Sequence, residues 1–188
     1  LKGHRGKITD LQYSSEWQAL FSTSIDGYLM IWNGGHLVAQ FLNKERRSDP
    51  FGVPLHSCAF NPRKDQLIVG AVGEIFVFQI TWDLIQNSQD GVHVQTIKPM
   101  LRMNLHKDII HKAMCCGDKL ITASHDRTIG YSRLDSLSVN KILPLKERQA
   151  ICNYAYDSPN ETVYVGSIDG RIHAITRDGL VLQSDSIG

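Results

Sequence analysis

One short phrase recurs four times along the chain, and this repetition limits the possible folds more than any other feature. The phrase joins an apolar run, a tight turn and a second alternating run. Its clearest copies occupy residues 20–32, 120–131 and 163–175, and a degenerate copy at 67–78 lacks one residue at the turn. The small residue that closes each first run, at Ser24, Ala71, Ser124 and Ser167, recurs roughly every 40 to 50 residues, a period typical of propeller blades or helical arrays.

The local pattern decides between those two architectures in favour of strands. The turns carry Asp-Gly, Asp-Arg or Val-Gly, which tolerate the positive φ that a β-hairpin needs. A strand-like run precedes each hairpin, at residues 8–13, 56–60, 111–115 and 151–156, and another follows, at 37–42, 97–105, 139–143 and 180–183. The sequence therefore predicts an all-β chain of four four-stranded blades, at about residues 3–42, 54–105, 106–143 and 147–184.

These phrases resemble the repeats of the WD-repeat β-propeller family. Gly3-His4 and Trp32 match the Gly-His and Trp-Asp landmarks of that family, although Asn33 replaces the final Asp. The resemblance implies a structural tetrad, in which His, Ser, Asp and Trp side chains satisfy one another inside a blade. It places tetrad members at His4, Ser24, Asp26 and Trp32 in blade one, at His106, Ser124 and Asp126 in blade three, and at Ser167 and Asp169 in blade four.

The number of blades indicates an incomplete ring. A typical propeller of the resembled family has about seven blades, whereas this sequence carries four. An open stack leaves an apolar face uncovered at each end. Either the four blades belong to a longer chain, or a further chain segment or another chain completes the propeller, and ring closure favours the first explanation.

Composition and charge exclude several classes of function. The 20 basic and 19 acidic residues leave a formal charge of +1, so global charge gives no reason to expect nucleic acid as a partner. No apolar run reaches the ~18 residues that cross a membrane. The four cysteines form no CxxC pair and the eight histidines are scattered, so we predict no metal site and no cofactor. Free thiols of this kind are typical of an intracellular protein, and we expect a cytoplasmic one, with a nuclear location as the alternative.

The recurrence of Ser, His and Asp invites comparison with a hydrolase triad. Here the three residue types recur at the blade period, which a single active site has no reason to do, so no enzyme is predicted. We expect instead a non-catalytic scaffold for protein–protein interaction in a multiprotein complex. The alternative is a regulatory or targeting subunit of an enzyme or of a nucleic-acid-processing machine.

In the resembled family, partners bind the top face, where the loops before each first strand meet the hairpin turns. One such loop, residues 43–54, is longer than the ~2–6 residues that a connection needs. It is either a solvated loop or a charged and aromatic contact. By position, the candidate binding residues are Arg5, Lys7, Ile25, Arg46, Arg47, Phe51, His56, His125, Arg148 and Ile168.

A second insertion, at residues 81–95, is expected on the opposite, bottom face. Its composition is polar, so we predict a mobile loop. Trp82 either packs beneath the blade or presents a contact, and packing is the simpler interpretation.

Overall fold

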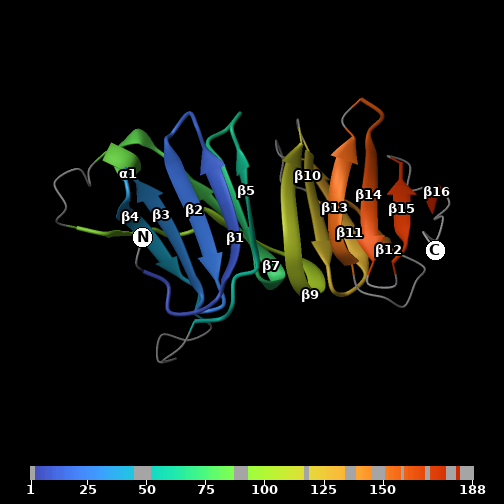
Figure 1. Ribbon diagram of the computed structural model, residues 1–188, viewed down its shortest axis with the longest axis horizontal. Coiled ribbons are helices and arrows are strands. Elements are labelled where there is room, and N and C mark those ends of the chain that lie inside the picture. The colour runs from blue at the N-terminus through green and yellow to red at the C-terminus, as the bar shows by residue number, and fades with distance from the viewer. Residues whose placement is uncertain are drawn as a thin grey trace.

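The chain folds into antiparallel sheets that stand side by side in chain order (Figure 1). The computed structural model describes residues 3–44, 52–86, 93–116, 119–133, 139–144, 151–157, 159–167, 170–176 and 181–182. Within these ranges, α1 (Trp82–Gln86) is the one helix, and strands make up most of the remainder. The all-β prediction is confirmed. No helix in the described ranges is long and apolar enough to cross a membrane.

Blades one and four are simple meanders of four strands each. Blade one contains β1 (Ile8–Ser14), β2 (Ala19–Ser24), β3 (Tyr28–Asn33) and β4 (His36–Leu42). Blade four contains β13 (Ile151–Asp157), β14 (Thr162–Ser167), β15 (Ile172–Ile175) and β16 (Val181–Leu182). A short strand, β8 (Gln95–Thr96), pairs in parallel with the outer edge of β4.

Blades two and three share one strand, which joins them into a seven-stranded sheet. Blade two contributes β5 (Ser57–Asn61), β6 (Gln66–Gly70) and β7 (Val72–Gln79), and blade three contributes β10 (Lys119–Ser124), β11 (Thr128–Arg133) and β12 (Val139–Pro144). Between them runs β9 (Leu101–Cys116), whose first residues pair with β7 and whose last residues pair with β10. The sequence predicted two separate strands here, at 97–105 and 111–115. That prediction is wrong, because the backbone stays extended through the blade junction.

Each inner blade is buried on both faces, which explains the continuous apolar runs of β6 and β7. In β7, Phe76 and Phe78 pack toward blade one, whereas Ile75 and Val77 pack toward blade three. Successive side chains of a strand point to opposite faces, so one strand feeds two hydrophobic cores. A third core, which contains Ile121, joins blades three and four.

The predicted loop at residues 81–95 is partly a helical turn, which corrects the sequence interpretation. Leu84 and Ile85 of α1 are buried in the core between blades one and two. The Thr81 side chain accepts the amide hydrogen of Leu84 at 3.4 Å and so caps the turn. Two adjacent apolar residues inside a polar stretch were the signal for this anchor.

A chain of hydrogen bonds crosses blade one between His4, Ser22, Asp26 and Trp32. Nδ1 of His4 lies 3.2 Å from Oδ2 of Asp26, and Nε2 lies 2.7 Å from Oγ of Ser22. The Trp32 indole donates to the same Oγ at 2.9 Å. One neutral tautomer satisfies every group: Nδ1–H donates to Asp26, and Nε2 accepts the Ser22 hydroxyl.

The serine of this network is therefore Ser22, and its assignment to Ser24 was wrong. Ser24 instead accepts the amide hydrogen of Asp26 at 3.2 Å and so shapes the turn. Both serines point to the same face of β2, two residues apart, so the pattern alone could not separate them. Ser22 is the one opposite Met30, two pairs along the ladder from the Leu20–Trp32 pair.

Blade three repeats the network with threonines, and the same correction applies. Nε2 of His106 lies 2.8 Å from Oγ1 of Thr122, whereas Ser124 accepts the amide hydrogen of Asp126 at 3.1 Å. Nδ1 of His106 lies 2.7 Å from Oγ1 of Thr128, which in turn donates to Asp126 at 2.6 Å. The hydrogen-bond network of blade three thus consists of His106, Thr122, Thr128 and Asp126.

The remaining assignments vary from blade to blade. Ser132 pairs with Leu120 as Trp32 pairs with Leu20, so a small polar side chain occupies the tryptophan position of blade three. In blade four, Val165 occupies the position of Ser22, as judged by the Val163–Ile175 pairing. The Ser167 side chain and Asp169 lie outside the described residues.

The network predicts unequal costs for two matched truncations. Trp32→Ala should lower the free energy of unfolding by about 3–5 kcal/mol, because Trp32 is buried and its indole N–H donates a hydrogen bond to the Ser22 hydroxyl. Ser132→Ala should change it by less than about 0.5 kcal/mol, because the buried Ser132 hydroxyl has no hydrogen-bond partner in the described part of the chain. Urea unfolding of the two variants checks this. Equal losses would contradict the assigned register.

Candidate protein-binding surface

The Asp26 carboxylate fixes the loop that precedes β1 to the first hairpin turn. Oδ2 accepts the backbone amide hydrogens of Arg5 at 2.8 Å and of Gly6 at 3.3 Å, while Oδ1 accepts that of Tyr28 at 2.9 Å. The Ile25 amide also donates to the Lys7 carbonyl at 3.0 Å. The exposed side chains of Arg5, Lys7 and Ile25 therefore project from a backbone that these hydrogen bonds hold in place.

Equivalent bonds recur at the same edge of the next blades. Leu55 donates to the Ser24 carbonyl at 3.1 Å, which ties the segment before β5 to the turn of blade one. His125 donates to the Ile109 carbonyl at 2.9 Å, and the Lys107 amide donates to Asp126 at 2.7 Å. We call this edge the top surface and define it by Arg5, Lys7, Ile25, His56, Lys107, Asp108, His111, His125 and Arg127.

Half of the candidate binding residues can be placed. The structure brings together on the top surface the candidates Arg5, Lys7, Ile25, His56 and His125. The other five, Arg46, Arg47, Phe51, Arg148 and Ile168, lie outside the described residues. A binding role for either group stays a prediction.

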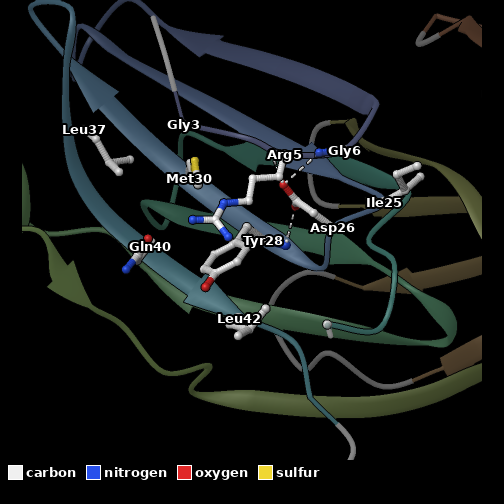
Figure 2. A pocket seen from close by; sticks show the side chains of 11 residues that line it. Gly3, Arg5, Gly6, Ile25, Asp26, Tyr28, Met30, Leu37, Gln40 and Leu42 are labelled. Carbon is white, nitrogen blue, oxygen red and sulfur yellow. Dashed lines mark hydrogen bonds between the residues drawn. The ribbon is translucent and has the colours of Figure 1, made fainter. Parts of the chain in front are cut away.

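A pocket of about 750 Å³ opens beside the loop that carries Arg5. Its described lining consists of Gly3, Arg5, Gly6, Ile25, Asp26, Tyr28, Met30, Leu37, Gln40, Leu42 and Gly52. Figure 2 shows the Arg5 side chain extending across the pocket toward the ring of Tyr28, with Met30 above it in this view. The pocket combines an apolar wall with a guanidinium, a phenol and an amide. The sequence did not identify Tyr28, Met30 and Gln40 as candidate binding residues, because they lie within strands and the candidates were chosen from loops.

The top surface carries more exposed positive than negative charge among its described residues. Arg5, Lys7, Lys107 and Arg127 are exposed, and Asp108 is the exposed carboxylate between them. The Asp26 carboxylate is not counted with these exposed charges, because its oxygens accept hydrogen bonds from His4 and from backbone amides. Burial raises the pKa of Asp26, but the amides of Tyr28 and Arg5 and the neighbouring His4 outweigh that effect and hold the pKa below its ordinary value.

Three histidines from blades two and three meet on this surface. The rings of His111 and His125 stack with centroids 5.0 Å apart. Burial lowers the pKa of His56, and the nearby His125 lowers it further, while Asp108 opposes both effects. His56 and His125 are among the candidate binding residues that the sequence predicted, and His111 is not.

His111 is the centre of this histidine cluster (His56, His111 and His125). Both of its ring nitrogens are buried, and neither has a hydrogen-bond partner in the described residues. Burial, followed by the charges of His125, Lys112, His106 and His56, lowers the pKa of His111 to about 4. The folded chain therefore keeps His111 neutral where a free histidine would take up a proton.

The Asp–His–Ser chain of blade one has the order of a catalytic triad but lacks an open nucleophile. Ser22 is 2% exposed, and its oxygen already accepts the Trp32 indole hydrogen. Blade three repeats the chain with Thr122, which is also buried. These groups hold blades together. Within the described residues, no group of three or more His, Cys, Asp or Glu side chains could hold a metal ion.

Comparison with known proteins agrees with the architecture. Residues 1–33 match the family model described as WD domain, G-beta repeat. The WD40 β-propeller domain of Doa1 superposes with a TM-score of 0.75 over 100% of this chain and 57% of that one, at 17% identity. The fold is that of a WD40 β-propeller. The WD40 repeats of RRP9 give the same TM-score over 97% of this chain and 52% of that one, also at 17% identity.

Sequence relatives fall into two groups. The human U3 small nucleolar RNA-associated protein 4 homolog is 38% identical over 85 residues, which cover 45% of this chain and 12% of the relative. The guanine nucleotide-binding protein subunit beta of Solanum tuberosum is 28% identical over 136 residues, which cover 68% of this chain and 32% of the relative. The chain thus spans a third or less of these relatives and about half of the solved structures.

The histidine cluster predicts that stability falls as the pH is lowered from about 6.5 toward 4. The unfolded chain protonates His111 near pH 6.5, whereas the folded chain resists until about pH 4, so acid favours the unfolded state in this interval. His56 and His106 have lowered pKa values and act in the same direction. His111→Phe should reduce the loss of stability between pH 7 and 5 by about 1–2 kcal/mol, allowing for partial solvent screening.

Urea unfolding of the wild type and of His111→Phe at both pH values checks this. His93→Phe is the matched control, since His93 lies outside the cluster. An unchanged pH dependence in His111→Phe would show that His111 protonates normally in the folded chain.

Proposed function

We propose that this WD-repeat chain is a non-catalytic scaffold whose top surface docks other proteins or peptides within a multiprotein complex. The observation that supports this most directly is the set of backbone bonds from Asp26 and Asp126, which hold exposed loops on rigid strands. A surface fixed before binding loses little conformational entropy when a partner arrives. Two relatives, a guanine nucleotide-binding protein subunit beta and a U3 small nucleolar RNA-associated protein, are by name proteins that assemble with others.

The chemistry of the pocket favours a partner segment that joins an apolar side chain to an acidic group. Met30 and Leu37 line an apolar wall, and the Arg5 guanidinium stands beside it. Arginine binds carboxylates through paired, charge-assisted hydrogen bonds, and a neighbouring apolar anchor excludes water from them. Ile25, 44% exposed at the rim, extends the apolar contact.

The second candidate is a regulatory or targeting subunit of an enzyme or a nucleic-acid-processing machine. It is favoured by the 38% identity with a U3 small nucleolar RNA-associated protein and by the exposed cations of the top surface. In either role the chain acts inside the cell, in the cytoplasm or the nucleus. The free thiols Cys58, Cys115 and Cys116 support this, since burial raises the pKa of each and keeps it protonated.

The test combines Arg5→Glu with Ile25→Asp in the full-length protein. We expect the amount of co-purifying partner to fall at least about tenfold, because the change reverses a charge and removes an apolar anchor. The unfolding midpoint should stay the same, since both side chains are exposed. Recovery is measured by quantitative mass spectrometry of the purified complex, with Arg63→Glu on the opposite edge as the charge-matched control.

A second set, Arg46→Glu with Arg47→Glu and Phe51→Ala, extends the test to the loop between blades one and two. Unchanged recovery for both sets, together with loss of the partner on altering residues 81–95, would move the docking surface to the bottom face. If RNA co-purifies with the wild type, and if the difference in partner recovery between wild type and variants disappears at high salt, the result would favour the nucleic-acid machine over the protein scaffold.

A further inference from the structure

The bottom of blade one presents an exposed tryptophan at the opposite edge of the sheets from the top surface. Trp82 begins α1, which lies beyond the far ends of β2 and β3 (Figure 1). Its side chain is 52% exposed, while Trp17 and Trp32 are each 5% exposed. A large aromatic side chain left open to water on a structured element points to a contact.

The Trp82 ring is held in place by a second, buried tryptophan. The ring centroids of Trp17 and Trp82 lie 4.5 Å apart with the planes tilted by 39°. Trp17 is itself fixed, because its indole donates to Oδ1 of Asp65 at 2.9 Å. Leu84 and Ile85 anchor the same helical turn in the core. One face of Trp82 is therefore packed, and the rest of the ring is presented on a rigid support.

A pocket of about 260 Å³ lies beside this pair. Its described lining consists of Glu16, Trp17, Gln18, Asn33, Trp82, Ile85 and Gln86. Glu16 is the one charged group among these described residues, and it is exposed. The volume is that of several water molecules at ~30 Å³ each, below the ~300–1,000 Å³ of sites for drug-sized ligands. The pocket therefore suits the end of a side chain better than a whole small molecule.

We propose that this pocket binds a cationic side chain, the guanidinium or ammonium of an Arg or Lys in a partner protein. The face of an indole attracts cations more strongly than those of the other aromatic rings do, and the Glu16 carboxylate supplies the opposite charge. A carboxylate or phosphate ligand would be repelled by Glu16. An apolar wedge would strip water from Glu16, Gln18 and Asn33 without replacing their hydrogen bonds.

This site is independent of the top surface. It lies at the other edge of the sheets and recognises the opposite charge, so one WD-repeat chain can contact a basic segment below and an acidic segment above. A planar guanidinium can stack on Trp82 while its N–H groups reach Glu16, so arginine should bind better than lysine.

The experiment follows the three indole N–H signals by two-dimensional ¹H–¹⁵N NMR while N-acetyl-arginine amide is added to the intact chain. The signals of Trp82 and Trp17 should shift and saturate in the roughly millimolar range, and that of Trp32 should stay still. N-acetyl-citrulline amide, which has the same shape without the charge, is the ligand control. Its effect should be at least about threefold weaker.

Two variants assign the effect to the named side chains. Glu16→Gln should weaken arginine binding about threefold to tenfold while the spectrum stays folded. Asp83→Asn, which removes a nearby carboxylate outside the described lining, should leave it unchanged. Absence of a saturable shift, equal shifts with citrulline, equal movement of Trp32, or equal losses for Glu16→Gln and Asp83→Asn would each overturn the proposal. Because the readout is a free amino-acid derivative at the bottom pocket, none of these outcomes depends on partner capture at the top surface.

Discussion

The buried hydroxyl of Ser22 is the point at which the first blade is joined together. Its oxygen meets the Trp32 indole from β3 and the His4 ring from the loop before β1, and His4 leads on to Asp26 in the hairpin turn. A buried polar group without a partner costs about 1–3 kcal/mol, so each member depends on the others. The same series of hydrogen bonds fixes the top surface, because the Asp26 carboxylate that accepts from His4 also accepts the amide hydrogens of Arg5 and Gly6.

The other blades keep the architecture with less of this network. Blade three replaces serine and tryptophan with Thr122 and Ser132, while blade two has Val69 and Phe78 at the corresponding positions. There, continuous apolar strands and the shared strand β9 supply the order that polar side chains supply in blade one. Two kinds of interaction thus yield the same meander, one specific and directional, the other general and dependent on buried area.

Much of the fold could be predicted from the sequence, because strand alternation and hairpin turns are local properties. β1 begins where the predicted run at 8–13 begins, and β2 and β3 together span the predicted hairpin at 20–32 to within one residue at each end. The tetrad serine could not be predicted, because Ser22 and Ser24 share a face and differ only in their distance from Trp32. The continuity of β9 and the anchoring of α1 depend on neighbouring blades, and so does the position of His111. These tertiary contacts leave little trace in local sequence.

The most direct test compares Ser22→Ala with Ser24→Ala by urea unfolding at neutral pH. Ser22→Ala should lower the free energy of unfolding by about 2–4 kcal/mol, because it removes a partner from both His4 and Trp32 in a buried setting. Ser24→Ala should cost at most about 1 kcal/mol, because the hydrogen bonds that it removes, to the amide and the carboxylate of Asp26, lie within one half-buried turn. Equal costs, or a larger cost for Ser24→Ala, would contradict the role of Ser22 as the junction of the blade.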